Sequence, residues 1–256
     1  VRLLKGEVNP SGKLAETWPM TYDDVISKNT FGKKNTEYRE GIYVGYRYYD
    51  KANVSVRYPF GYGLSYTTFV YSDLSVEGNE VRVTITNTGA VKGKEAVLMY
   101  VGNDTEGYHA KKELKRFAKV ELEPGQSKQV QFTLDDDCFQ VWDKKWKVKA
   151  GTYQILVGSL SATIEVEGES VESVEDGWYV TLKGEPTREQ WEKLMGCKVP
   201  EFKEAVKGEF TLDNTVLEMS ETSGFIRLLT KFVTWFVSRG VDGPKDMSNP
   251  TYRMMV

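Results

Sequence analysis

The chain has 256 residues, enough for more than one compact domain and a sizeable core. Its net charge of -3, together with the lack of any apolar run near the about 18 residues of a spanning helix, argues against nucleic-acid and membrane partners. The two cysteines, Cys138 and Cys197, argue against a disulfide framework and favour a reducing compartment such as the cytoplasm.

Residues 1–68 have little periodicity and many glycines and aromatic residues, so we expect a connection with one strand at 12–17. Tyrosine and phenylalanine are dense in EGIYVGYRYYD (40–50) and RYPFGYGLSYTTF (57–69). Two interpretations of these rings stay open. They pack one domain onto another, or they form a rim whose aromatic faces stack on sugar rings.

From Thr68 the pattern changes to alternation, as in Val81, Val83 and Ile85, which is typical of half-buried strands. Turn residues interrupt this pattern at short intervals. We therefore expect an antiparallel β-sandwich. The expected strands lie near 74–76, 81–87, 95–102, 116–122, 126–134, 139–148, 151–158 and 161–166.

After Glu169 the sequence predicts helices. Thr187 and Gln190 have the spacing of a capping box, which predicts a short helix that ends at Met195. A longer helix is expected from about Ser223 to Ser238. Its apolar residues recur at three and four positions, so we expect one face to be buried, either on the rest of a larger enzyme or in a subunit contact.

Three phrases in fixed order carry a resemblance to a known family. NPSGKLAETWP (9–19), EGIYVGYRYYD (40–50) and PFGYGLSYT (59–67) closely resemble the end of the second catalytic-module domain of glycoside hydrolase family 3 enzymes. ELKRFAKVELEPGQSKQVQFTL (113–134) and GTYQILVGSLS (151–161) resemble the fibronectin type III-like domain that many family 3 β-glucosidases carry next. The resemblance is weaker beyond about residue 169.

This resemblance implies a fold class and three regions. The expected fold is mainly β, with a fibronectin type III-like antiparallel β-sandwich at 69–168. The end of the family's α/β sandwich domain with its connecting loops precedes it at 1–68, and a C-terminal extension with helices follows at 169–256. We expect the chain to be a fragment, although a rearranged domain order in the parent stays open.

The resemblance also implies chemistry for the parent enzyme. It would be a retaining exo-acting β-glycosidase that releases terminal non-reducing β-D-glycosyl residues without a cofactor or a metal. Such an enzyme uses two carboxyl groups about 5 to 5.5 Å apart. In this family the nucleophile is an Asp on an N-terminal barrel, and the acid/base is usually a Glu before the NPSGKL stretch. Neither region is present, so we assign no catalytic residue and expect the chain alone to be inactive.

If any side chain here approaches sugar, the best candidates are Tyr43, Tyr46, Tyr48 and Tyr62, at the rim of the pocket. The partners implied are a β-linked glycoside, bound through the parent enzyme, and the barrel-bearing part of that enzyme. A homo-oligomer stays open. The alternative hypothesis is a non-catalytic β-sandwich that binds carbohydrate or protein, for which Trp142, Trp146 and Trp178 would have to be exposed.

Other candidate residues have simpler explanations. The acidic run 135–137 follows one strand and precedes another, so a solvated turn is expected. Glu40, at the head of an aromatic loop, is expected to pair with Arg39, Arg47 or Arg57. His109 is the sole histidine and lacks neighbours at metal-ligand spacing, so we expect a surface side chain. The run GYGLS (61–65) lacks the lysine of a phosphate-binding loop, and the lysines at 111–119 are diluted by glutamates.

Overall fold

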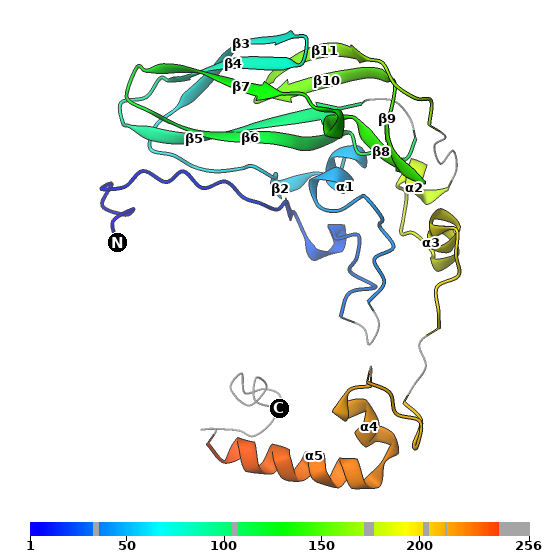
Figure 1. Ribbon diagram of the computed structural model, residues 1–256. Helices are drawn as coiled ribbons and strands as arrows, with labels where there is room; N and C mark the ends of the chain where they lie inside the picture. Colours follow the sequence, from blue (N-terminus) through cyan, green and yellow to red (C-terminus); the bar gives the residue numbers. More distant parts are fainter. Residues whose placement is uncertain (33–35, 104–106, 172–176, 202–204, 213, 241–256) are drawn as a thin grey trace. The chain divides into compact units, whose positions relative to one another are not determined.

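The computed structural model describes the chain apart from residues 33–35, 104–106, 172–176, 202–204, 213 and 241–256 (Figure 1). Its contacts divide the chain into two compact units, Val1–Lys198 and Val199–Val256. The fold is mainly β with antiparallel sheets. Among the described residues, the longer helices lie in the C-terminal part. The three domain boundaries expected from the sequence stay a prediction. In the described residues, no helix combines the length and the apolar character needed to cross a bilayer.

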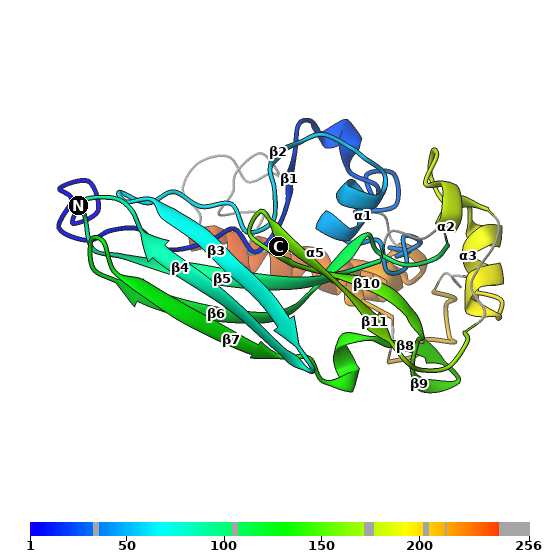
Figure 2. The same ribbon diagram turned by 90° about the horizontal axis from the view of Figure 1, so that it is seen from above.

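Two antiparallel sheets form the sandwich in the first unit (Figures 1 and 2). One sheet has the order β3-β4-β7, and the other has the order β11-β10-β5-β6. The strands are β3 (Phe69–Glu77), β4 (Glu80–Asn87), β5 (Gly93–Gly102), β6 (Lys112–Leu122), β7 (Ser127–Thr133), β10 (Gly151–Val157) and β11 (Leu160–Val166). The antiparallel sandwich expected from alternation is confirmed.

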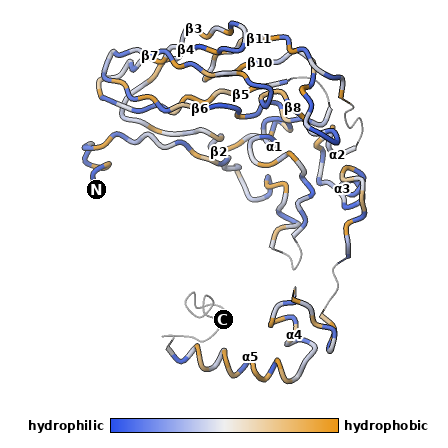
Figure 3. The backbone as a smooth tube through the Cα atoms, viewed as in Figure 1, coloured by the Kyte–Doolittle hydropathy of each residue, from blue (hydrophilic) through white to orange (hydrophobic). Residues whose placement is uncertain are grey.

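Alternating side chains build the core between these sheets. Val81, Val83 and Ile85 of β4 are fully buried, while the residues between them are partly exposed. Val97 and Met99 of β5 meet them from the other sheet in the same cluster. Figure 3 shows the same alternation of hydrophobic and hydrophilic residues along the strands. Because side chains of a strand point to opposite faces, this pattern places each sheet with one face in the core.

Buried Asn87 ties the end of β4 to neighbouring segments. Its amide donates to the carbonyl oxygens of Val91, at 2.9 Å, and Leu122, at 3.0 Å, and its carbonyl accepts from the hydroxyl of Thr67. A buried amide needs such partners, because an unsatisfied polar group in the interior is costly. The sandwich is thereby linked to the chain segment that enters it.

The strand expected at 139–148 is wrong in one respect. The structure divides it into β8 (Gln140–Asp143) and β9 (Lys145–Val148), which pair as a hairpin. The turn lies at Lys144, whose φ of 59° is left-handed and reverses the chain. An ion pair of 2.8 Å between Asp143 and Lys147 closes the hairpin.

The connection expected at 1–68 is confirmed as a region of few regular elements. It contains β1 (Trp18–Pro19), η1 (Tyr22–Asp24), α1 (Tyr46–Lys51) and β2 (Val56–Tyr58), with β1 paired to β2.

The strand expected at 12–17 is wrong. The backbone of Leu14 makes two hydrogen bonds to the loop at 61–62. Its amide donates to the Tyr62 carbonyl at 2.7 Å, and its carbonyl accepts from the Gly61 amide at 2.8 Å. These two hydrogen bonds do not continue along the chain, so no strand forms at 12–17. The chains instead cross closely, since a Cβ on Gly63 would collide with the carbonyl oxygen of Gly12.

Two short helices complete the first unit, α2 (Trp178–Thr181) and α3 (Arg188–Met195). The predicted capping box is confirmed, because the Gln190 amide donates to the Thr187 hydroxyl at 3.2 Å and its side chain accepts from the Thr187 backbone at 2.9 Å. The predicted end at Met195 is also confirmed.

The second unit contains α4 (Val216–Thr222), α5 (Gly224–Val237) and η3 (Ser238–Gly240). The long helix is confirmed as α5. Sequence reasoning missed α4, although Thr215 and Glu218 form the same kind of capping box as Thr187 and Gln190. No residue of α5 is buried in the described chain, and Phe225 and Leu228 are among its exposed apolar side chains. The burial expected for this face therefore stays a prediction.

Candidate functional site

The loop with the sequence EGIYVGYRYYD folds back on itself through two glycines. Gly41 and Gly45 have φ values of 60° and 57°, a conformation that glycine adopts without strain. A Cβ on Gly41 would also collide with the hydroxyl of Tyr108, which accepts a hydrogen bond from the Ile42 amide at 3.1 Å. After Gly45 the chain enters α1, which carries two of the four candidate tyrosines, Tyr46 and Tyr48.

Tyr43 is fully buried in an aromatic cluster. Its ring contacts those of Tyr108 and Trp178 edge-on, with centroids 5.6 Å and 5.9 Å away. Its hydroxyl donates to the carbonyl oxygen of Tyr179 at 2.8 Å. Burial raises the pKa of Tyr43 to about 12, because the tyrosinate form would lose its hydration. We call this cluster the aromatic junction; it consists of Tyr43, Tyr48, Tyr49, Tyr108, Trp178 and Tyr179.

Tyr48 also belongs to the aromatic junction and is buried. Its ring lies nearly parallel to that of Trp178, at 6.4 Å and 18°, and edge-on to Tyr49 at 5.3 Å. Burial raises its pKa as well. The indole nitrogen of Trp178 donates to the Gly184 carbonyl at 2.9 Å, so the junction also holds the segment after the sandwich.

Tyr46 lies between the connection and the sandwich. Its hydroxyl accepts a hydrogen bond from the Leu114 amide of β6 at 2.9 Å. Its ring is 5.0 Å from Phe60 and 5.9 Å from Tyr100. Tyr46 therefore joins both aromatic loops to one sheet of the sandwich.

Tyr62 is the most exposed of the four candidates, with 37% of its surface accessible. Its ring lies 4.8 Å from Tyr58, which in turn lies 6.0 Å from Trp18. Trp18 and Tyr62 thus belong to one exposed aromatic strip. Sequence reasoning missed Trp18 and Tyr58 as neighbours of Tyr62, although Trp18 closes one family phrase and Tyr58 opens another.

The structure therefore brings Tyr43 and Tyr48 together in a buried cluster and places Tyr46 and Tyr62 outside it. Contact of any of the four with sugar stays a prediction. The packing of the rings within the chain agrees with the first interpretation of the aromatic loops for Tyr43 and Tyr48.

The ion pair expected for Glu40 is wrong. Arg39 contacts Glu37 at 2.5 Å and Arg47 contacts Glu113 at 3.3 Å. In the part of the chain that the structure describes, no ion pair joins Glu40 to Arg39, Arg47 or Arg57. Glu40 is buried, and its negative charge adds to the burial that raises the pKa of Tyr179 to about 12. The charge of Glu40 thus affects the ionisation of Tyr179 in the aromatic junction.

The acidic run 135–137 forms the start of a 3-10 turn, η2 (Asp136–Cys138). Its carboxylates hold Arg116 of β6, with contacts of 3.0 Å from Asp135 and 2.7 Å from Asp137. Hydrogen bonding to Arg116 lowers the pKa of Asp137. The expected turn is confirmed, and its charges belong to an ion-pair network.

Among the described residues, no group of histidine, cysteine, aspartate and glutamate could hold a metal ion. His109, expected at the surface, is only partly exposed, and its Nδ1 lies 3.0 Å from the Ala110 carbonyl oxygen. Cys138 is buried, Cys197 is exposed, and both are free.

Known proteins with a similar sequence and structure were found. Residues 95–161 match the Fn3-like family of fibronectin type III-like domains. A GH3 β-glucosidase from Bifidobacterium adolescentis has a similar structure, with a TM-score of 0.62 and 34% identity over 76% of this chain and 31% of that protein.

Curated relatives agree. Thermostable β-glucosidase B of Acetivibrio thermocellus is 44% identical over 63% of this chain and 23% of the relative. An exo-α-(1→6)-L-arabinopyranosidase of Bifidobacterium breve is 40% identical over 73% of this chain and 26% of the relative. The chain thus spans about a quarter of the length of these relatives. The chain is similar to a segment of glycoside hydrolase family 3 β-glucosidases, and it includes a fibronectin type III-like domain.

Proposed function

We propose that this chain is the supporting C-terminal portion of a retaining, exo-acting β-glycosidase that hydrolyses terminal non-reducing β-D-glycosyl residues. The observation that carries the proposal is the match to a β-glucosidase structure over 76% of the chain, which includes more than the fibronectin type III-like domain. The carboxylate pair of the reaction would lie on the remaining, barrel-bearing part of the enzyme.

The role of this portion would be to hold the aromatic loops in place. Tyr46 binds the loop at 40–50 to β6, and Tyr43 binds it to the carbonyl oxygen of Tyr179. Both hydrogen bonds reach backbone atoms, so they fix the position of the loop rather than that of a flexible side chain. A loop that frames one side of a substrate pocket needs such support, since misplacement by about 1 Å can lower a rate by about 100-fold.

We propose Tyr62 as the residue at the rim that contacts sugar. Of the four candidates, Tyr62 has the most accessible ring, and it continues into Trp18 through Tyr58. An exposed tyrosine offers a flat apolar face and a hydroxyl, which suits the two kinds of surface on a pyranose. Tyr43, Tyr46 and Tyr48 would then support the loop from behind.

The substrate would be a β-D-glucoside. Curated relatives that carry the name β-glucosidase match this chain, among them that of Acetivibrio thermocellus. One relative of similar identity is named an exo-α-(1→6)-L-arabinopyranosidase. An arabinopyranoside therefore belongs in any substrate panel.

The proposal is tested with the isolated chain and with a chimera. The isolated chain should hydrolyse none of the 4-nitrophenyl β-D-glucoside, β-D-xyloside, β-D-galactoside, N-acetyl-β-D-glucosaminide or α-L-arabinopyranoside. A chimera in which this chain replaces the matching segment of the Acetivibrio thermocellus β-glucosidase should hydrolyse the β-D-glucoside. Proton NMR should show the β-anomer of glucose as the first product.

Turnover by the isolated chain would overturn the assignment of the carboxylate pair to the missing part. An inactive but folded chimera would overturn the supporting role. In the active chimera, Tyr62→Ala should raise KM or lower kcat, whereas Phe117→Ala, which removes an exposed ring from β6, should leave both constants unchanged.

One observation favours a second candidate function, a carbohydrate-binding sandwich. Trp142 and Trp146, on the hairpin of β8 and β9, are 65% and 62% exposed, whereas Trp178 is buried. However, the two exposed rings meet edge-on at 75°, so they do not form a coplanar platform. Binding of the chain to insoluble cellulose or xylan that is lost in the Trp142→Ala, Trp146→Ala double variant would support this function.

The second unit would serve as a docking element. The exposed apolar side of α5 includes Phe225, Leu228, Phe232 and Phe236. We expect the rest of the enzyme to cover it, because faces of this size are seldom left in water. A contact between subunits is the alternative, and the molar mass of the chimera in solution would distinguish the two.

A further inference from the structure

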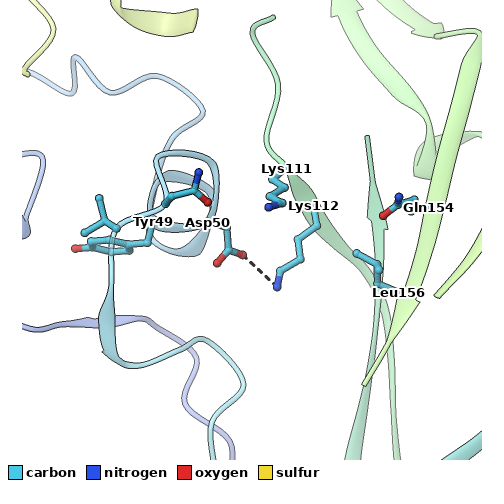
Figure 4. Close-up of a pocket in the computed structure, with 8 residues that line it drawn as sticks. Tyr49, Asp50, Lys111, Lys112, Gln154 and Leu156 are labelled. Atoms are coloured by element: carbon cyan, nitrogen blue, oxygen red, sulfur yellow. Dashed lines mark ion pairs between the residues drawn. The ribbon is translucent and has the colours of Figure 1, made fainter. Parts of the chain in front are cut away.

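A pocket of about 390 Å³ lies where the connection meets the sandwich (Figure 4). One side is formed by α1 and the residues that follow it, and the other side is formed by the start of β6 and by β10. In Figure 4, Asp50 faces Lys112 across this space, with Gln154 and Leu156 on the strand beyond. The pocket belongs entirely to the first unit.

A carboxylate in this pocket lacks a hydrogen bond. Oδ2 of Asp50 lies 3.2 Å from the Lys112 ammonium, which makes an ion pair. The same oxygen is buried and, apart from this ion pair, accepts no hydrogen bond from the residues that the structure describes. A buried carboxylate oxygen without a hydrogen bond is unfavourable. The site therefore favours a ligand that brings a donor to Asp50.

The other polar groups supply both donors and acceptors. Asn53 and Gln154 are exposed amides, each of which can donate and accept. Lys111 and Lys112 add donors, and Lys112 lies 5.1 Å over the ring of Tyr100, which keeps its ammonium near the pocket. A ligand that carries several hydroxyl groups matches this set, because each hydroxyl can also donate and accept.

The size and the apolar lining restrict the ligand further. A volume of 390 Å³ is at the small end of the range for ligand pockets, about 300 to 1,000 Å³. Leu156 and Val54 provide apolar surface beside the polar groups. Asp50 would repel a phosphate, whereas Lys111 and Lys112 would attract it, so inorganic phosphate has to be tested beside the sugars.

We propose that this pocket is a binding site for a single pyranose sugar. The Asp50 carboxylate and the amides of Asn53 and Gln154 hold hydroxyl groups, and Leu156 contacts an apolar face of the ring. Every residue named at the site belongs to this chain, so sugar binding can be measured without the rest of the enzyme.

The test is an NMR titration of the ¹⁵N-labelled 256-residue chain. The probes are methyl β-D-glucopyranoside, methyl β-D-xylopyranoside and inorganic phosphate. At least one glycoside should give saturable shifts at the amides of Asn53, Lys112 and Gln154. Asp50→Asn and Gln154→Leu should each weaken this binding about five- to tenfold, as expected for one lost hydrogen bond.

Gln129→Leu is the matched control, because it makes the same change at an exposed position of β7 in the other sheet. It should bind as the unmodified chain does. The proposal is overturned if neither glycoside gives saturable shifts at these amides, if both pocket variants bind normally, or if phosphate alone saturates the site. Since the readout is binding by this chain, these failures would leave the glycosidase proposal intact.

Discussion

The sandwich core and the aromatic junction are both buried, yet they are built from different side chains. The sandwich core consists mainly of aliphatic residues such as Val83, Ile85 and Met99, which need no hydrogen-bond partner. The aromatic junction consists of tyrosines and a tryptophan. Tyr43 donates to a backbone carbonyl of a distant segment, and Trp178 donates to that of Gly184, six residues further along the chain.

The amino-acid sequence also specifies the two regions in different ways. In the sandwich, the buried residues alternate within single strands, so any strand carries its own signal. In the aromatic junction, residues near 43, near 108 and near 178 come together, and each segment is too short to form a core alone. The aromatic junction therefore depends on long-range contacts and on satisfied hydroxyl groups, whereas the sandwich depends on volume and pattern.

The largest effect is expected from removal of the central indole of the aromatic junction. Trp178→Ala should lower the free energy of unfolding of the first unit by about 3 to 5 kcal/mol, because it deletes a ring that contacts Tyr43, Tyr48 and Tyr179. Urea unfolding followed by circular dichroism measures this change. The control Trp142→Ala, at an exposed position, should cost less than about 1 kcal/mol.

A comparable change in the sandwich should cost slightly less. Ile85→Ala creates a cavity at a fully buried position of β4 and should lower the free energy of unfolding by about 2 to 5 kcal/mol. The control Thr84→Ala changes the other face of the same strand and should cost less than about 1 kcal/mol. Equal losses for both variants would contradict the position of the core.

A smaller effect should separate hydrogen bonding from packing. Tyr43→Phe keeps the ring but leaves the Tyr179 carbonyl without its donor, so the free energy of unfolding should fall by about 1 to 2 kcal/mol. Tyr22→Phe, at an exposed position, should have no measurable effect. If Tyr43→Phe is as stable as the unmodified chain, the aromatic junction depends on packing alone.

A further effect should appear at alkaline pH. The pKa values of Tyr43 and Tyr179 are raised to about 12, whereas tyrosine in an unfolded chain ionises near 10. The unfolded state therefore loses these protons first. The stabilisation from the neutral hydroxyls is complete below about pH 10 and is lost as the pH rises through 12.

Urea midpoints at pH 9, 10, 11 and 12, with tyrosinate absorbance recorded in parallel, would measure this loss. Tyr43→Phe should make the decline shallower, because one of the raised tyrosine pKa values is removed. An unchanged slope in Tyr43→Phe would contradict the assignment to this residue.

Some elements were predictable because their causes are local. The alternation in β4 and the Thr187–Gln190 capping box both act within a few residues, and both were predicted. The same reasoning would have found α4 from Thr215 and Glu218. The hairpin at Lys144 was missed, because a lysine with φ of 59° is unusual and Asp143 beside it is a weak turn signal on its own.

The candidate site was predictable only in part. The phrases that carry the four tyrosines also predicted the family, which the comparisons bear out. Which tyrosine is buried depends on Tyr108, Trp178 and Tyr179, and two of these lie more than 100 residues away. The fate of Glu40 likewise depended on where Glu37 and Glu113 lie, because they pair with the arginines expected to bind it.

The sandwich, the capped helix α3 and the resemblance to glycoside hydrolase family 3 could be predicted from the amino-acid sequence, because alternation, capping and family motifs all depend on residues that are close in the chain. Only the tertiary structure decided that Tyr43 is enclosed while Tyr62 is exposed, and that Asp50 faces Lys112 across a pocket. The physical reason is that burial and pairing are properties of neighbours in space, and those neighbours come from distant parts of the chain.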